Sequence, residues 1–233
     1  MKLRPSESKE HTKCYMCVAI ATSKEHVPPD CFFPKGYRDN LTTVPSCPTH
    51  NNDNSKDVEY VRNIVVTHHA TNEVARVHFR EKALKSFKRS PKLFSQTLQN
   101  AKEILFNGEI TGVGILDLTR FKSSMKAIAF GIYFGNYGKS FDGDWEIFGT
   151  GLVSTEALFE GKADGSEDLR RVLTALTFEE LTMPQPEVFR CKRHQWDDVS
   201  MVYEFLFYGG FLVHAISLPN QTSVASHRIL PTN

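Results

Sequence analysis

Hydrophobic residues recur at helical spacing between residues 118 and 134, which predicts an amphipathic helix there. The apolar positions that share one face of this helix are Phe121, Met125, Ile128, Ala129 and Ile132. A shorter helical pattern covers residues 170–181.

Three downstream segments have the pattern of strands, and they cover residues 145–153, 188–192 and 201–217. The pair Gly209-Gly210 predicts a turn that divides the last segment into two strands. Charge is sparse from Tyr203 to Ile216, which indicates that these strands are buried. Pro184 and Pro186 mark a loop.

The upstream part of the chain divides into two regions. Residues 1–66 are rich in Cys, His, Asn and Pro, whereas residues 67–106 are polar and mostly helical in pattern, up to Ile104 and Leu105. Pro91 must break or start a helix in this second region, because proline cannot continue a helix through its interior. With residues 107–233 as a third region, the sequence predicts an α+β fold.

Composition adds a few limits. The chain has 233 residues of which 40% are hydrophobic, enough for a sizeable core. No apolar run approaches the ~18 residues of a membrane helix, and residues 1–13 lack the apolar segment of a signal peptide. We therefore expect a cytoplasmic protein without a membrane partner. Walker and dinucleotide fingerprints are missing, so no nucleotide cofactor is expected.

The net charge is only +1, but basic residues gather between residues 76 and 92, where seven Lys and Arg accompany one acid, Glu81. Such a stretch could contact phosphates, in which case the candidates for nucleic-acid binding are Arg80, Lys85, Lys88 and Arg89. A solvated helix face explains the same pattern equally well.

Four of the cysteines and histidines have the spacing of metal ligands. Cys14-Tyr-Met-Cys17 is one knuckle, and Cys47-Pro-Thr-His50 follows after 29 intervening residues. Three thiolates and one imidazole form a closed, structural Zn²⁺ set. The count of five cysteines is odd, which argues against a disulfide framework, and Cys31 is expected to be a small buried residue near Phe32 and Phe33.

The residues between and after the knuckles complete a compact motif. Glu25-His26-Val27-Pro28-Pro29 lies between the knuckles, followed by residues 40–47 (NLTTVPSC), and residues 55–60 (SKDVEY) follow the second knuckle. A short strand, a loop, a second strand and a helix fit this order.

These motifs resemble the HNH endonuclease family, in particular small bacterial and phage proteins with a CxxC, EHVPP, NLxTVPxC and SKDxEY pattern. The resemblance covers about 50 residues. It implies a ββα-metal fold in residues 1–66. The pattern along the rest of the chain makes residues 67–106 a helical connector and residues 107–233 a C-terminal α+β region of unknown role. The resemblance also implies an enzyme that cuts DNA in phage defence or in a mobile element.

The resemblance carries family roles onto four residues. His26 matches the general base, for which an imidazole suits because its ordinary pKa of about 6.5 leaves a neutral base near neutral pH. Glu25 and Asn51 match the oxygen ligands of a catalytic Mg²⁺ or Mn²⁺, and Asn40 matches a residue that steadies the loop bearing the base. The chain departs from the family's usual pattern at His50, where Cys is more frequent, and at Asn51, where His is frequent.

Two other functions remain open. A zinc finger could bind nucleic acid without cutting it, although such a module does not need the general base, the oxygen ligands and Asn40 together. The C-terminal region could be a sensor or a docking domain for a partner protein, although core packing explains its aromatic strands as well. Cutting both DNA strands with one site would suggest a homodimer.

Overall fold

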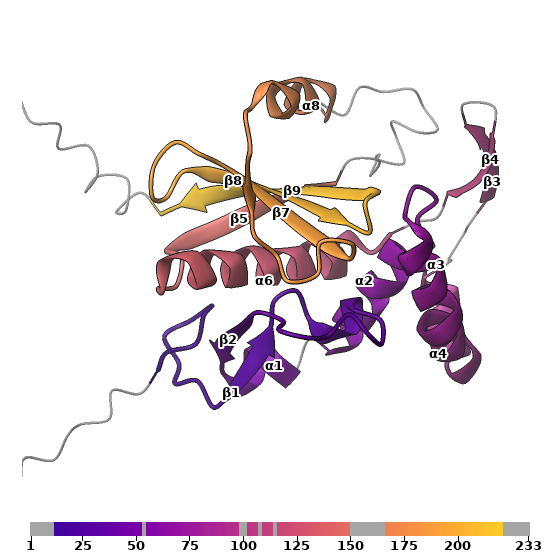
Figure 1. Ribbon diagram of the computed structural model, residues 1–233, viewed down its shortest axis with the longest axis horizontal. Helices are drawn as coiled ribbons and strands as arrows, with labels where there is room; N and C mark the ends of the chain where they lie inside the picture. Colours follow the sequence, from indigo (N-terminus) through magenta and orange to yellow (C-terminus); the bar gives the residue numbers. More distant parts are fainter. Residues whose placement is uncertain are drawn as a thin grey trace, which may run out of the picture.

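The computed structural model describes residues 12–52, 55–97, 102–106, 109–113, 116–149 and 166–220, and over these ranges the chain is a mixed α+β protein. The strands in them form a small hairpin near the N-terminus, a second hairpin and a five-stranded sheet (Figure 1).

The N-terminal part begins with a β-hairpin. Strand β1 (Ser23–His26) pairs antiparallel with β2 (Thr43–Ser46), and a short 3-10 helix, η1 (Asp30–Phe32), lies in the connection. Helices α1 (Pro48–Asn52) and α2 (Ser55–Thr67) follow. The predicted order of strand, loop, strand and helix is confirmed.

A run of helices comes next. The elements are α3 (Glu73–His78), the π-helical turn η2 (Phe79–Ala83), α4 (Leu84–Arg89) and α5 (Pro91–Thr97). The side chain of Asn72 caps the first of them by accepting a hydrogen bond from the backbone N–H of Ala75. Pro91 starts α5, which is one of the two roles predicted for it.

The helix predicted around Ile104 and Leu105 is wrong, because these residues lie in β3 (Lys102–Phe106), paired antiparallel with β4 (Glu109–Val113). The sequence between the two strands is Asn107-Gly108, a dipeptide that strongly favours tight hairpin turns. A search for turn residues would have detected this hairpin, whereas the apolar spacing alone could not distinguish a short strand from a helix.

The C-terminal part packs one long helix against the five-stranded sheet. Helix α6 (Leu118–Tyr137) confirms the prediction for residues 118–134, its five predicted core residues are buried, and Gly138 ends it in a left-handed conformation. The sheet is antiparallel throughout, in the order β5-β9-β8-β7-β6. Its strands are β5 (Gly143–Gly149), β6 (Glu179–Leu181), β7 (Phe189–Gln195), β8 (Met201–Phe207) and β9 (Phe211–Pro219).

The three strand predictions are confirmed over the described residues, with β7 matching the one at 188–192, and one helix prediction is partly wrong. The turn at Gly209 and Gly210 separates β8 from β9, as predicted. Strand β5 covers the start of the strand predicted at 145–153, of which residues 150–153 lie outside the described ranges. The helix predicted at 170–181 is α8 (Ser166–Ala175), and residues 179–181 form the edge strand β6, where pairing with β7 outweighs the helical pattern.

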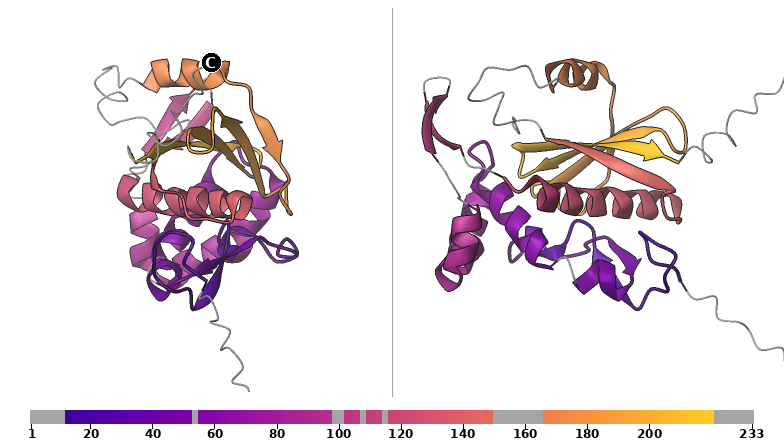
Figure 2. Two further views of the ribbon diagram at one scale, coloured as in Figure 1. Left: turned by 90° about the vertical axis from the view of Figure 1, so that its left-hand side faces the viewer. Right: turned by 180° about the vertical axis from the view of Figure 1, so that it is seen from behind.

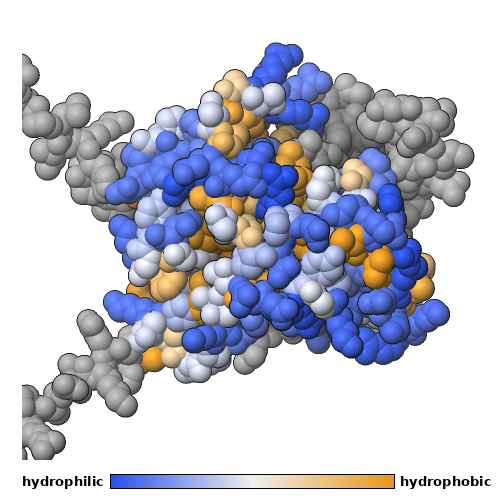
Figure 3. All heavy atoms as spheres, viewed as in Figure 1, coloured by the Kyte–Doolittle hydropathy of each residue, from blue (hydrophilic) through white to orange (hydrophobic). Residues whose placement is uncertain are grey.

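Helix α6 lies in the middle of the molecule. It covers one face of the sheet, α8 lies beyond the other face, and the N-terminal hairpin lies against the opposite side of α6 (Figures 1 and 2). One hydrophobic core runs through these layers, from Val27 and Phe32 near the hairpin to Tyr203 and Phe207 in the sheet. Seen from one side, the surface is mostly hydrophilic, with small separate apolar patches (Figure 3).

Gly131 allows α6 to approach the hairpin closely. A Cβ at this position would lie 2.8 Å from Val27 Cγ1 and nearer still to Val27 Cγ2, whereas a Cβ at Gly135 would meet nothing within 4 Å. Val27 follows His26 directly, so this contact sets the distance between α6 and the end of β1.

We expect Gly131→Ala to lower the free energy of unfolding by about 1–3 kcal/mol, because the short, stiff Val27 side chain has no room to move aside. The matched variant Gly135→Ala should instead raise it by up to about 1 kcal/mol, since alanine is the better helix former. Urea unfolding monitored by circular dichroism measures both, and equal effects of the two variants would contradict this account of Gly131.

A buried hydrogen-bond chain links the helices to the sheet. The Tyr208 hydroxyl donates to the carbonyl oxygen of Phe32, and it lies 2.7 Å from Nδ1 of His78, which must therefore be the protonated nitrogen. Nε2 of His78 is buried and has no hydrogen-bond partner among the described residues. Burial, followed by the charges of Arg62 and two further cations, lowers the pKa of His78 to about 3.

This pKa is lower in the folded chain than the ordinary value of about 6.5. Between these two pH values the unfolded chain therefore binds a proton at His78 that the folded chain does not bind. Stability should therefore fall as pH drops from about 6.5 towards 3, and His78→Asn, which keeps an N–H donor near Nδ1, should make that fall shallower. Urea titrations of the wild type and of His78→Asn between pH 7 and pH 4 would test this. An unchanged slope in His78→Asn would refute it.

No helix in the described parts of the chain is both long and apolar enough to span a bilayer.

Candidate functional site

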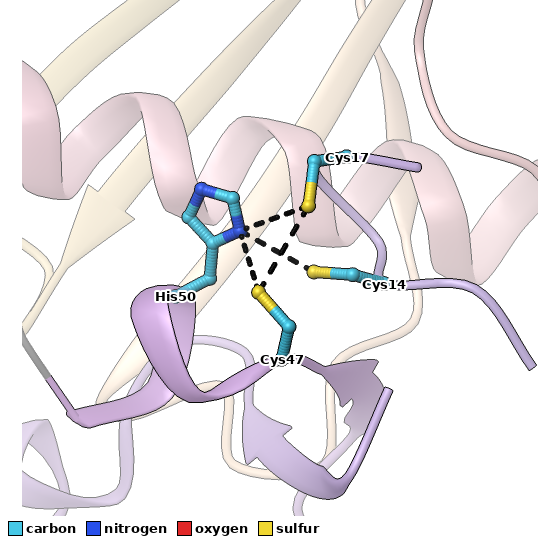
Figure 4. Close-up of side chains that lie close together, drawn as sticks. All are labelled: Cys14, Cys17, Cys47 and His50. Atoms are coloured by element: carbon cyan, nitrogen blue, oxygen red, sulfur yellow. Dashed lines mark hydrogen bonds between the residues drawn. The ribbon is translucent and has the colours of Figure 1, made fainter. Parts of the chain in front are cut away.

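The two predicted knuckles come together in space. Cys14 and Cys17 lie in the loop before β1, where the N–H of Cys14 donates to the carbonyl of Ala19 at 2.8 Å. Cys47 follows β2, and His50 lies in α1, whose first turn places the N–H of His50 3.1 Å from the carbonyl of Cys47. The local folds of a hairpin and a short helix thus present four ligand atoms to one point (Figure 4).

The geometry of these atoms suits a tetrahedral metal ion. Nδ1 of His50 lies 3.4, 3.6 and 3.3 Å from the sulfurs of Cys14, Cys17 and Cys47, and the sulfurs of Cys17 and Cys47 are 3.9 Å apart. Bond lengths of ~2.3 Å for Zn–S and ~2.05 Å for Zn–N give edges of about 3.8 Å between sulfurs and about 3.6 Å from sulfur to nitrogen in a tetrahedron. The four residues could therefore hold a metal ion, consistent with zinc.

Cys31 stays outside this cluster, as predicted. Its side chain is partly rather than fully buried, because it lies at the wall of a neighbouring pocket, and burial raises the pKa of its thiol to about 12. The fifth cysteine, Cys191, is fully buried in the sheet.

A pocket of about 210 Å³ lies beside the metal cluster. Three of the predicted site residues, Glu25, His26 and Asn51, line it together with the predicted zinc ligand His50. β1 supplies Glu25 and His26, and α1 supplies Asn51. The pairing of β1 with β2, together with the turn of α1 that follows β2, brings the three residues together. Asn40 does not line this pocket. It is exposed, three residues before β2, in a left-handed conformation with φ 58° that asparagine tolerates.

The pocket is unfavourable for an isolated negative charge. Burial, and secondly the neighbouring Asp30, raise the pKa of Glu25 to about 7. Asp30 also lines the pocket but pairs with Arg38 at 3.2 Å. A carboxylate in such surroundings gains from a nearby positive charge.

The side chain of Asn51 is held by Ser23 of the hairpin, which is itself hydrogen-bonded to Ser46. Its Nδ2 donates to Oγ of Ser23 at 2.7 Å, and this Oγ donates to the carbonyl oxygen of Ser46 at 3.2 Å. Ser23 and Ser46 are directly opposite each other in the pairing of β1 with β2.

Sequence reasoning missed the contribution of α6 to this pocket. Ala127 and Ile128 form one wall, and Tyr15 forms another next to the edge of the His50 ring. The helical periodicity of α6 predicted that Ile128 is buried but not against which element.

Arg120 fastens α6 to the helix that follows the site. Its Nε donates to Asp57 at 2.6 Å, its guanidinium also donates to the carbonyl of Lys56 at 2.9 Å, and it lies 4.2 Å from the centre of the Tyr60 ring. These contacts hold the start of α2 against α6.

The four predicted nucleic-acid-binding residues lie away from the pocket on η2 and α4. Arg80 is engaged with Glu73 at 3.0 Å, whereas Lys85, Lys88 and Arg89 are exposed and have no ion pair among the described residues. Their positions fit both a phosphate-binding surface and a solvated helix face.

A comparison of the chain with known protein families, curated proteins and solved structures found no match.

Proposed function

We propose that the chain is a metal-dependent HNH endonuclease that hydrolyses phosphodiester bonds in DNA. The observation that supports this most directly is the pocket that Glu25, His26 and Asn51 share beside a four-ligand metal cluster. These are three of the four residues that the HNH resemblance selects, with Asn40 outside the pocket, and 24 residues separate His26 from Asn51 in the chain.

In this proposal each residue has one task. His26 accepts the proton of the attacking water. Glu25 and Asn51 offer hard oxygen atoms for a Mg²⁺ or Mn²⁺ ion, which when bound would stabilise the charge that develops on the phosphate. The zinc ion would be structural, holding the loop before β1 against the start of α1.

The alternative is a zinc-finger module that binds nucleic acid without cutting it. The metal cluster fits both functions, but such a module has no use for a general base and oxygen ligands in one pocket. A third possibility is a C-terminal docking or sensor region. Only the aromatic residues of the sheet support it, and many of them are already buried in the hydrophobic core.

Cleavage of supercoiled plasmid tests the proposal. We expect nicking in Mg²⁺ or Mn²⁺, loss of nicking with EDTA, and recovery when Mg²⁺ is added back without zinc. Linear duplex, single-stranded DNA and RNA in the same assay would identify the substrate. Retarded migration of DNA without cleavage of any substrate in either metal would favour the zinc-finger alternative.

The basic residues of α4 offer a separate prediction about binding. If Lys88 and Arg89 contact phosphates, changing both to Gln should reduce the slope of log K against log salt by up to about 2, because fewer counterions are released. The control, Arg170→Gln/Arg171→Gln, removes two exposed charges from α8, which lies beyond the other face of the sheet. Equal slopes in both double variants would show that the α4 residues form a solvated face.

A further inference from the structure

The link from Asn51 to Ser23 and Ser46 determines which end of the Asn51 amide faces away from the hairpin. A serine hydroxyl carries one proton, and Ser23 gives this proton to the carbonyl oxygen of Ser46, which can only accept. The lone pairs of Ser23 Oγ are then left to accept, so the amide group at 2.7 Å must present its nitrogen.

This orientation leaves Oδ1 as the outward atom of the amide. Oδ1 has no hydrogen-bond partner among residues whose placement is described, and Asn51 lines the pocket with Glu25 and His26. Oxygen is the only atom of an asparagine side chain that binds a hard cation, because the amide nitrogen has no available lone pair. An amide turned by 180° would present N–H groups to the cation instead.

Packing alone gives little reason for this hydrogen bond. Ser23 is exposed, so water could satisfy both its hydroxyl and the amide, and the net gain in stability from such a bond is small.

We propose that Ser23 is a positioning residue that fixes the Asn51 amide with Oδ1 available to a divalent cation in the pocket. This rests on the proposed function, in which Asn51 is a ligand of the catalytic ion. It assigns to the hairpin a second task, that of orienting a ligand supplied by α1.

Direct binding of Mn²⁺, followed by electron paramagnetic resonance on the zinc-loaded protein, tests the proposal without relying on cleavage. We expect Ser23→Ala to weaken Mn²⁺ binding by about 10- to 100-fold, the usual effect of removing a group that orients a metal ligand. Ser23→Thr keeps the hydroxyl and should bind as the wild type does. The matched control Thr22→Ala removes a hydroxyl from the neighbouring exposed position and should change nothing.

A double-variant cycle separates orientation from general damage. A carboxylate has two equivalent oxygens and no wrong orientation, so Ser23→Ala should cost much less in the background of Asn51→Asp than in the wild type. Zinc content and melting temperature should be the same in all variants. In the cleavage assay, Ser23→Ala should raise the Mn²⁺ concentration for half-maximal rate while leaving the rate at saturating Mn²⁺ nearly unchanged.

The outcomes distinguish this inference from the proposed function. Mn²⁺ binding that is unchanged in Ser23→Ala but weakened in Asn51→Ala overturns the role of Ser23 alone, as does an equal loss in both backgrounds of the cycle. A wild-type protein that binds Mn²⁺ in a Ser23-dependent way but cuts nothing refutes the nuclease and leaves the inference standing. Absence of Mn²⁺ binding to the wild type overturns the inference.

Discussion

Replacing His26 by alanine is expected to lower the rate of DNA cleavage by about 10²- to 10⁴-fold, the range that a general base contributes. The loss follows because the attacking water would lose the imidazole that the proposal assigns as its proton acceptor. Binding of DNA should persist, since nothing in this change removes a cation. Single-turnover nicking at saturating Mg²⁺, together with a gel-shift assay, measures the two effects separately.

The matched control for this variant is His69→Ala, an exposed histidine outside the pocket. It should cut at the wild-type rate, and both variants should retain one zinc per chain and the wild-type melting temperature. A His26→Ala protein that cuts within threefold of the wild type would refute the role of His26. A loss of zinc in this variant would mean that structural damage accounts for the lost activity.

The second large effect is expected at the metal cluster. His50→Ala removes one of four ligands and should loosen zinc and unfold the region around the hairpin, because structural zinc contributes its binding energy directly to folding. His50→Cys should retain zinc, fold and most of the activity, since a thiolate completes the same tetrahedral set. Elemental analysis, thermal melts and nicking assays on the two variants provide the comparison.

His50 is an informative position because it borders both centres. Nδ1 faces the three sulfurs (Figure 4). The same residue also lines the pocket with Glu25 and Asn51. If His50→Cys kept zinc but abolished cleavage, the ring would have a task in the pocket, and the division of His50 and Asn51 between two metal ions would be wrong.

The sequence predicted best those features whose signals are local. The spacing of Cys14, Cys17, Cys47 and His50 predicted the cluster because a knuckle is defined by two ligands close in the chain. The period of α6 and the glycine turn between β8 and β9 were equally local, and both predictions are confirmed.

Features that depend on tertiary contacts were missed. Residues 179–181 continue a helical pattern, yet they form β6 because β7 offers an open edge for pairing. Apolar periodicity shows that one face of a helix is buried, but it does not show which element buries that face. It therefore could not predict that Ala127 and Ile128 form a wall of the pocket, or that Arg120 binds Asp57 of α2. The hydrogen bond from Asn51 to Ser23 joins positions 28 residues apart and leaves no mark in the pattern of either segment.

Because α6 lies between the hairpin and the sheet, metal binding at the hairpin should also stabilise the sheet. The core that contains Cys14 and Val27 is continuous with the one that contains Tyr203 and Phe205. Ligand binding to the native state stabilises every amide that exchanges only by unfolding of the same cooperative unit. Zinc held by the N-terminal knuckles should therefore slow amide hydrogen exchange in β8, on the far side of α6 from the metal, as well as in the hairpin.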